Sequence, residues 1–240
     1  CVGESIAGRG HCIVVEASSG LGKSRVLREL GLEAQLAGMR VLEVAGDLGR
    51  SPWGVMQALV SRALALVPEG VNAIDREHRA RLARTFPALA SRLAATAEPR
   101  AAPVAEPAEQ RIRVQSSLVA LWRALLRSSP LAILVDDLQR CDEASAAVLA
   151  ALVRSGDDGP LLVAASLRTN EAVRAAAAVS SIAGADVRLR LSGLEEADVL
   201  TLVESSFGAI AHVATTARLG SPVRPSMMWC RPSPQARRLP

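Results

Sequence analysis

The sequence predicts an α/β fold in which a parallel sheet is buried on both faces. Five near-continuous apolar runs have the length of strands, and segments with helical spacing separate them, as in strands joined by crossover helices. Half of the 240 residues are hydrophobic but only 2% are aromatic, so the core must be built from aliphatic side chains. We therefore expect three layers, with helices on both sides of a five-stranded sheet.

The first strand-helix-strand unit is predicted between residues 12 and 45. Cys12 to Glu16 is a short β-branched run that enters a Gly-rich turn, and residues 24–37 then place apolar side chains at helical intervals. Gly38 is expected to end this helix, and residues 40–45 form the second predicted strand. One β-α-β unit is then complete.

The next segment is predicted to be mostly helical. Residues 52–67 and 76–93 have helical patterns, with a break at Pro68. Residues 97–108 contain three prolines, too many for a helix, and are expected to form a surface loop or disordered spacer. A further helix is predicted from Glu109 to Arg127.

Three more apolar strands complete the predicted core domain, residues 1–191. They cover residues 131–136, 161–166 and 187–191, and a helix over 143–154 separates the first two.

A second, helical region is expected to follow the core. Ser192-Gly-Leu-Glu195 has the pattern of a capping box and is expected to open a helix that runs to about Val203. We therefore predict the beginning of a truncated helical lid over residues 192–218.

The formal charge of +4 is concentrated near the end of the chain. Residues 217–240 hold five Arg and no acid, which leaves 23 basic and 24 acidic residues before them. This neutral body disfavours nucleic acid as a partner. Residues 219–240 also carry five prolines without any periodic pattern, so we expect a disordered basic tail there. The abrupt change resembles a reading-frame change or a truncation.

Composition also excludes several classes of protein. No apolar run approaches the ~18 residues of a membrane helix, so no membrane partner is expected. The four cysteines show neither a C-x-x-C pair nor a His at metal-ligand spacing, which argues against zinc and disulfides and favours a reducing cytoplasm. The first residues lack both Met and a secretory signal, and we expect the chain to be a fragment of a longer polypeptide.

The segment from Ala17 to Ser24, A-S-S-G-L-G-K-S, has the context of a phosphate-binding loop, because it follows a predicted strand and opens a predicted helix. Lys23 would bridge the β- and γ-phosphates, and Ser24 would offer its hydroxyl to Mg²⁺. Lys23 is the one Lys among 28 basic residues, and its compact ammonium reaches between phosphates where a planar guanidinium fits poorly. The loop is therefore predicted to bind a nucleoside triphosphate with Mg²⁺.

The predicted nucleotide contacts cover the loop and the first helical residues: Ala17, Ser18, Ser19, Gly20, Leu21, Gly22, Lys23, Ser24 and Arg25. Ala17 replaces the first Gly of the pattern G-x-x-x-x-G-K-[ST], which would strain the loop by ~1 kcal/mol if a left-handed conformation were needed there. The alternative interpretation is a Gly-rich turn that binds nothing.

An apolar strand ending in Asp136 and Asp137 matches the Walker B pattern. Because parallel strands end at one edge of a sheet, Asp136 is predicted to face the Mg²⁺ held by Ser24. Asp137 would then orient or activate the attacking water. The alternative is an ordinary buried strand whose acids cap the next helix.

Arg168 follows the next strand, where a basic side chain can sense the γ-phosphate. A solvated Arg at a strand end is the alternative. Asp142, a few residues after Walker B, is expected to cap a helix rather than to take part in chemistry.

Three segments, taken in order, resemble one family: I-V-V-E-A-S-S-G-L-G-K-S-R-V-L, L-A-I-L-V-D-D-L-Q-R-C-D-E and L-L-V-A-A-S-L-R. They are similar to the AAA-type ATPase domain of STAND proteins, signal-transduction ATPases with numerous domains found in bacterial regulators. The resemblance covers about residues 1–216. The family's adenine-contacting segment would lie before Cys1, and its G-x-P lid loop, expected after His212, is not found.

The resemblance implies a P-loop NTPase fold with strand order 5-1-4-3-2, ATP as the nucleotide, and Arg168 as the sensor. It further implies a slowly hydrolysing switch that is attached to effector domains of the kinase, cyclase or transcription-regulator type. Nucleotide-dependent homo-oligomers are expected by the same analogy.

Three functions remain open on the sequence. The leading one is an ATP-binding, slowly hydrolysing regulatory module, which makes the chain a weak ATPase. The second is a protein-interaction scaffold that keeps the fold without turnover. The third, a DNA-associated ATPase of the origin-recognition type, is disfavoured by the neutral body of the chain.

Overall fold

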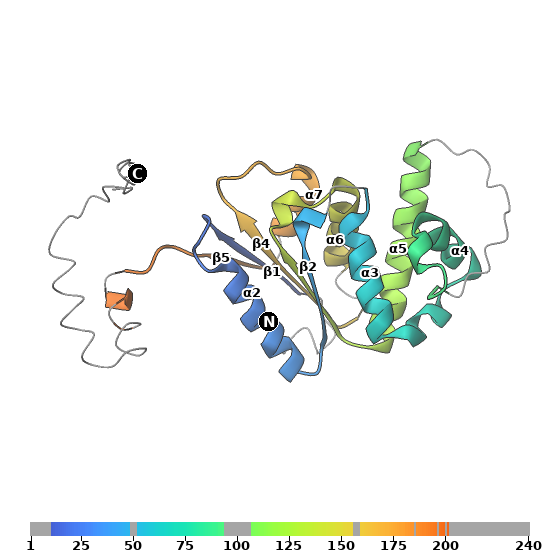
Figure 1. Ribbon diagram of the computed structural model, residues 1–240, viewed down its shortest axis with the longest axis horizontal. Helices are drawn as coiled ribbons and strands as arrows, with labels where there is room; N and C mark the ends of the chain where they lie inside the picture. Colours follow the sequence, from blue (N-terminus) through green and yellow to red (C-terminus); the bar gives the residue numbers. More distant parts are fainter. Residues whose placement is uncertain are drawn as a thin grey trace, which may run out of the picture. The chain divides into compact units, whose positions relative to one another are not determined.

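The computed structural model describes residues 11–48, 52–93, 107–155, 159–184, 186–195, 197–199 and 201. Its centre is one sheet with the order β2-β3-β4-β1-β5, in which all neighbouring strands run parallel (Figure 1). The strands are β1 (His11–Ala17), β2 (Arg40–Ala45), β3 (Leu131–Asp136), β4 (Leu161–Arg168) and β5 (Val187–Arg190). This is the predicted order counted from the other edge, so the predicted P-loop NTPase-like fold is confirmed.

The order of the strands determines which helices cover each face. From β1 the chain crosses to the far edge at β2 and then returns through β3 and β4, and parallel crossovers are right-handed. Helix α2 (Lys23–Leu36) therefore packs on one face (Figure 1). The later helices lie on the opposite side: α3 (Gly54–Leu66), α5 (Pro107–Ser128), α6 (Glu143–Ser155) and α7 (Ala176–Ala183).

Successive strand residues contribute to two different cores. In β3, Ile133 and Val135 belong to the large core shared with α3, α5, α6 and α7, whereas Leu134 belongs to the smaller core under α2. Gly31 lets α2 approach the sheet, because a Cβ there would lie 2.7 Å from Leu134 Cδ1. Both faces of the sheet are thus covered, as expected for parallel strands.

The segment between β2 and β3 adds helices beside the sheet. It contains η1 (Gly46–Leu48), α3, η2 (Pro68–Ala73), α4 (Arg76–Thr85), η3 (Pro87–Leu89) and α5. Helix α4 packs against α5, where Leu118 and Trp122 of α5 are fully buried.

Two predicted boundaries in this segment are wrong. The helix predicted over residues 76–93 ends at Thr85, because Pro87 lacks an N–H and disfavours a helical conformation at Phe86, where φ is −125° and ψ is 76°. Helix α5 begins at Pro107, inside the predicted loop 97–108, since proline is tolerated at a first helical position. Residues 97–106 lie outside the described part.

The end of the core also differs from expectation. Helix α7 has no counterpart among the predicted elements, although Ala175, Val179 and Ile182 are buried at helical spacing. The capping box predicted at Ser192 is wrong: the Glu195 N–H donates to Asp198 Oδ2 (3.3 Å) and Val199 N–H to the Glu195 carbonyl (3.0 Å), so the helix starts after Glu195.

The chain divides into two compact units after Ser192. The predicted lid (192–218) is described only in part, and the predicted tail (219–240) lies outside the described residues. Within those residues, no helix has both the length and the apolar character required to cross a bilayer.

Burial in the large core leads to a stability prediction that compares two leucines. Leu118 is fully buried and Leu36 is 90% exposed. Leu118→Ala should lower the free energy of unfolding by about 2–5 kcal/mol, because it leaves a cavity, whereas Leu36→Ala should change it by less than ~0.5 kcal/mol. Urea unfolding measures both, and equal effects would contradict the assigned core.

Candidate nucleotide-binding site

Three adjacent strands bring the predicted site residues to one edge of the sheet. β1 ends at Ala17 and pairs with β4, placing Ala17 opposite Arg168, and β3 ends at Asp136 on the other side of β4. The carboxyl ends of parallel strands form the usual ligand-binding edge of such sheets. The phosphate loop, the Walker B acids and Arg168 therefore lie together.

The loop adopts a conformation that depends on Gly20 and Gly22. Their φ angles are 84° and 85°, in the left-handed region that glycine reaches without strain. Ala17 is the last residue of β1, is 3% exposed, and is not among the described residues with positive φ. The strain considered for Ala17 therefore does not arise, because the positions that need glycine lie further along the loop.

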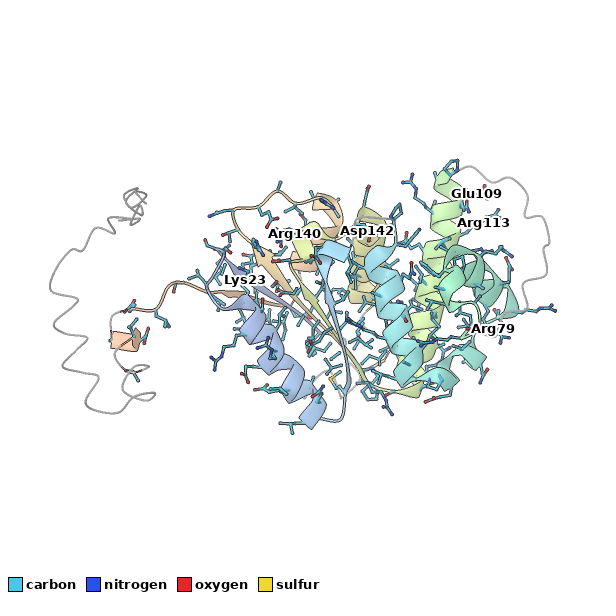
Figure 2. The ribbon with its side chains drawn as sticks, in the orientation of Figure 1. Lys23, Arg79, Glu109, Arg113, Arg140 and Asp142 are labelled. Atoms are coloured by element: carbon cyan, nitrogen blue, oxygen red, sulfur yellow. The ribbon has the colours of Figure 1, made fainter. Side chains whose placement is uncertain are left out.

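Lys23 is the first residue of α2 and lies at the end of that helix next to the loop (Figure 2). It is 6% exposed, and its Nζ donates to the carbonyls of Ala17 (3.1 Å) and Ser18 (2.7 Å). An ammonium has three N–H donors, so one remains for a phosphate oxygen. No side chain caps α2 at Gly22, which leaves the helix N-terminus available to an anion.

Most of the remaining predicted nucleotide contacts are more exposed to solvent than Lys23. Ser19, Gly20 and Arg25 are exposed, and Leu21 is half-buried. Ser18 Oγ lies 3.4 Å from Thr169 Oγ1, which links the loop to the segment after β4.

Ser24 and Asp136 meet at the mouth of the loop. Ser24 Oγ donates to Asp136 Oδ2 at 2.7 Å. The other carboxylate oxygen, Oδ1, accepts from Ser166 Oγ (2.5 Å) and from the Asp137 N–H (3.1 Å). Asp136 Oδ1 is thus held by Ser166 and the Asp137 N–H, and Oδ2 faces Ser24 of the loop.

This pair of oxygen donors fits Mg²⁺. Mg²⁺ prefers hard oxygen ligands and is usually bound by one or two carboxylates together with phosphates and water. Among the described residues there is no group of three or more His, Cys, Asp and Glu side chains that could hold a metal ion, and a Mg²⁺ shared with a nucleotide needs none. Ser24 and Asp136 are the residues that would hold it.

The predicted water-orienting acid, Asp137, is paired with the predicted sensor, Arg168. Asp137 has a left-handed φ of 54°, and its carboxylate accepts from Arg168 Nε (2.8 Å) and Nη2 (2.6 Å). Partial burial raises the pKa of Asp137, but hydrogen bonds from Arg168 and Gln139 and the charges of Arg168 and Arg140 outweigh it. The net result is a pKa below the usual carboxyl value.

A polar network that the sequence did not predict surrounds this pair. Gln139 is fully buried; its Nε2 donates to Asp137 Oδ1 and Glu171 Oε2 (both 3.2 Å), and its Oε1 accepts from the Arg168 N–H (3.2 Å). Glu171 also contacts Arg140 Nε (2.7 Å) and Arg168 Nη1 (3.5 Å). Arg140 is labelled in Figure 2. No sequence motif predicts a role for Gln139 or Glu171. Gln139 is buried as part of the short turn that follows Asp137.

Gly46 allows β2 to approach the Walker B turn. A Cβ at Gly46 would lie 2.3 Å from the Asp137 carbonyl oxygen and 3.2 Å from that of Asp136. These are backbone atoms, which cannot move aside as a flexible side chain can. Gly46 is therefore part of the framework of the site, although no sequence pattern indicated it.

Asp142 caps helices, as expected. Its Oδ1 accepts from the Ser145 N–H in the first turn of α6 (2.9 Å) and from the Trp53 N–H before α3 (3.0 Å). Two helix N-termini thus share one carboxylate, which their dipoles stabilise.

The comparison with protein-family models is consistent with this geometry. Residues 1–164 match the model of the AAA ATPase domain. The chain belongs to the AAA ATPase domain family. AAA domains are nucleotide-binding domains, and the match covers the phosphate loop, the Walker B acids and the first half of β4, ending before Ser166 and Arg168. The match does not distinguish the STAND branch, which stays a prediction.

Solved structures with a similar fold include nucleotide-bound proteins. The Aeropyrum pernix ORC2 protein, in ADPNP and ADP complexes, is 12% identical with a TM-score of 0.44, covering 82% of this chain and 45% of that one. AMPPCP-bound DnaA from Aquifex aeolicus is 16% identical with a TM-score of 0.43, covering 85% and 48%. Drosophila ORC, bound to GC-rich DNA and Cdc6, is 12% identical with a TM-score of 0.41, covering 88% and 65%.

The AAA domain described here spans about half the length of the first two of these proteins. No curated protein sequence matches it.

The close approach at Gly46 predicts that one added methyl group disturbs the AAA domain. Gly46→Ala should lower the free energy of unfolding by about 1–3 kcal/mol through overpacking. Gly184 is the matched control, because a Cβ there would lie at an ordinary 3.4 Å from the Ser180 carbonyl oxygen. Gly184→Ala should be neutral or stabilising by up to ~1 kcal/mol. Thermal and urea unfolding would measure both, and a stable Gly46→Ala would contradict the packing.

The lowered pKa of Asp137 predicts a contribution to stability that is lost in acid. The folded-state pKa lies below the unfolded value of about 3.9, so the contribution is complete above that pH and disappears as the pH falls through the folded value. Asp137→Asn should therefore be less stable than wild type at neutral pH, and the difference should shrink below about pH 4. Melting temperatures between pH 2.5 and 7 test this; a difference independent of pH would refute it.

Proposed function

We propose that this AAA domain binds Mg-ATP and hydrolyses it slowly, as the regulatory module of a larger signal-transduction protein. The observation that carries the proposal is the ion pair between Asp137, the proposed water-orienting residue, and Arg168, the proposed sensor. Binding and hydrolysis are supported by separate parts of the site.

Nucleotide binding is supported by the phosphate loop and by the pair of Ser24 and Asp136 beside it. Lys23 is held among loop carbonyls, the start of α2 is free of a side-chain cap, and the Ser24 hydroxyl meets Asp136. These groups would hold the phosphates and the Mg²⁺. Mg²⁺ would neutralise phosphate charge when bound. The choice of ATP over other nucleoside triphosphates rests on the family.

Slow hydrolysis is supported by the state of Asp137. A carboxylate that accepts two hydrogen bonds from one guanidinium, and whose pKa is lowered, is a weak base for an attacking water. Hydrolysis therefore requires Arg168 to leave Asp137. The γ-phosphate is an anion that competes for the same guanidinium, so its arrival would both engage the sensor and release the acid.

Regulation is supported by the position of Arg168 in its network. Arg168 also contacts Glu171, which in turn binds Arg140, so movement of Arg168 would alter the segment between β4 and α7. We propose that attached effector domains of the kinase, cyclase or transcription-regulator type, in a bacterial cytoplasmic protein, respond to this change. Nucleotide-dependent homo-oligomers would be one form of the response.

The same ion pair favours a second candidate, a nucleotide-binding scaffold without turnover. If Arg168 stays bound to Asp137 when the nucleotide is present, no acid is available to orient water. The DNA-associated alternative gains no support, because residues 1–216 have 23 basic and 24 acidic residues.

Loss of the loop ammonium should remove nucleotide binding. Titration calorimetry with Mg-ATP should show heat for the wild-type chain and none for Lys23→Ala, because the substitution removes the ammonium that the loop carbonyls of Ala17 and Ser18 hold. Arg28→Ala is the matched control, since it removes an exposed cation from the same helix. It should bind as the wild type does.

Phosphate release then separates the two candidates. Slow release by the wild type, abolished in Asp137→Asn, supports the hydrolysing module. Binding without any release supports the scaffold, and absence of binding by the wild type refutes both.

A further inference from the structure

We propose that Ser166 is a positioning residue for both Walker B acids, which orients Asp136 so that Oδ2 faces Ser24 and the metal. This inference rests on the proposed binding of Mg-nucleotide. Ser166 is fully buried in β4, so it acts through its neighbours rather than by touching a nucleotide.

The hydroxyl of Ser166 makes two contacts that differ in kind. It donates to Asp136 Oδ1 at 2.5 Å, and it accepts from the Asp137 N–H at 2.8 Å. A hydroxyl has one donor, and here that donor is given to the carboxylate of the predicted metal ligand. A single side chain on β4 therefore contacts both residues that end β3.

The donated bond determines how the Asp136 carboxylate lies. The terminal torsion of Asp is broad and nearly two-fold, so the carboxylate plane needs partners to become fixed. Ser166 and the Asp137 N–H hold Oδ1, which leaves Oδ2 at 2.7 Å from Ser24 Oγ. Without the hydroxyl, Oδ1 would keep only the longer bond of 3.1 Å from the Asp137 N–H.

The accepted bond determines how the Asp137 backbone lies. Asp137 has a φ of 54°, which is unusual for a residue with a side chain. The Ser166 hydroxyl satisfies its N–H and so supports this turn. This backbone conformation places the Asp137 carboxylate within hydrogen-bond distance of Arg168.

Partners outside the coordination shell commonly orient metal ligands, and their loss lowers metal affinity about 10- to 100-fold. The expected effect of Ser166→Ala is at the lower end, about tenfold, because Mg²⁺ here would also be held by phosphates, water and Ser24. The effect should be confined to binding that depends on Mg²⁺. A merely structural role would weaken binding with and without the metal alike.

The test uses a fluorescent ATP analogue and the full chain. Its affinity is measured in EDTA and over a series of Mg²⁺ concentrations for wild type, Ser166→Ala, Ser166→Thr and Ser117→Ala. Ser117 is the matched control: it is also fully buried, and its hydroxyl binds His78, Arg81 and the Arg113 carbonyl between α4 and α5.

For Ser166→Ala we expect the Mg²⁺ concentration at half-maximal effect to rise about tenfold, with unchanged affinity in EDTA. Ser166→Thr, which keeps the hydroxyl, should restore the wild-type Mg²⁺ dependence, and Ser117→Ala should leave both quantities unchanged. If Ser166→Ala does not fold, Ser166→Cys makes the same comparison, because a thiol is a weak donor.

Two results would overturn the inference while leaving the proposed function in place. One is wild-type Mg²⁺ dependence in a folded Ser166→Ala or Ser166→Cys variant. The other is an equal loss of affinity with and without Mg²⁺. If the wild-type chain itself shows no Mg²⁺-dependent binding, the proposed function fails, and this inference fails with it.

Discussion

The parallel pairing of β1, β4 and β3 is the constraint on which the rest of the site depends. It brings the carboxyl end of β1, at Ala17, to the same edge as those of β3 and β4, which follow it by more than a hundred residues of sequence. Ala17 lies opposite Arg168, and Asp136 ends the next strand. Right-handed crossovers then put α2 on one face, so that the phosphate loop can turn from β1 directly into the N-terminus of this helix. The pairing of the strands thus sets how far apart the site residues lie, and the phosphate loop and the residues at the strand ends carry the functional groups.

Two adjacent acids acquire different tasks because their surroundings differ. Asp136 receives hydrogen bonds from hydroxyls and a backbone N–H, which leaves its charge available to a cation. Asp137 receives a guanidinium, which compensates its charge and lowers its pKa. In our proposal, such a site favours the binding of Mg-nucleotide over rapid turnover, since Asp136 would be free to bind the metal while Asp137 is held by Arg168. This difference connects the AAA fold with the proposed regulatory role.

The polar network around Arg168 connects the site with the segment that leads to α7. Gln139, fully buried, contacts Asp137, Arg168 and Glu171, and its backbone carbonyl accepts from the Arg174 N–H before α7. A buried polar group whose partners move must find new ones or bear a desolvation penalty. For this reason a rearrangement at Arg168 would not remain local, and in our proposal this is how nucleotide state reaches attached domains.

The sequence alone indicated an AAA-type ATPase domain, the parallel α/β fold and the residues of the phosphate loop and Walker B strand, because these follow from local patterns; the STAND branch stays a prediction. G-K-S needs a strand before it and a helix after it, and an apolar run ending in Asp136 and Asp137 is visible without coordinates. Only the tertiary structure decided that Asp137 and Arg168 bind each other, that Ala17 is unstrained, and that Ser166, Gln139 and Gly46 belong to the site. Those facts depend on distances between strands and on backbone angles at single turns, which a linear pattern does not encode.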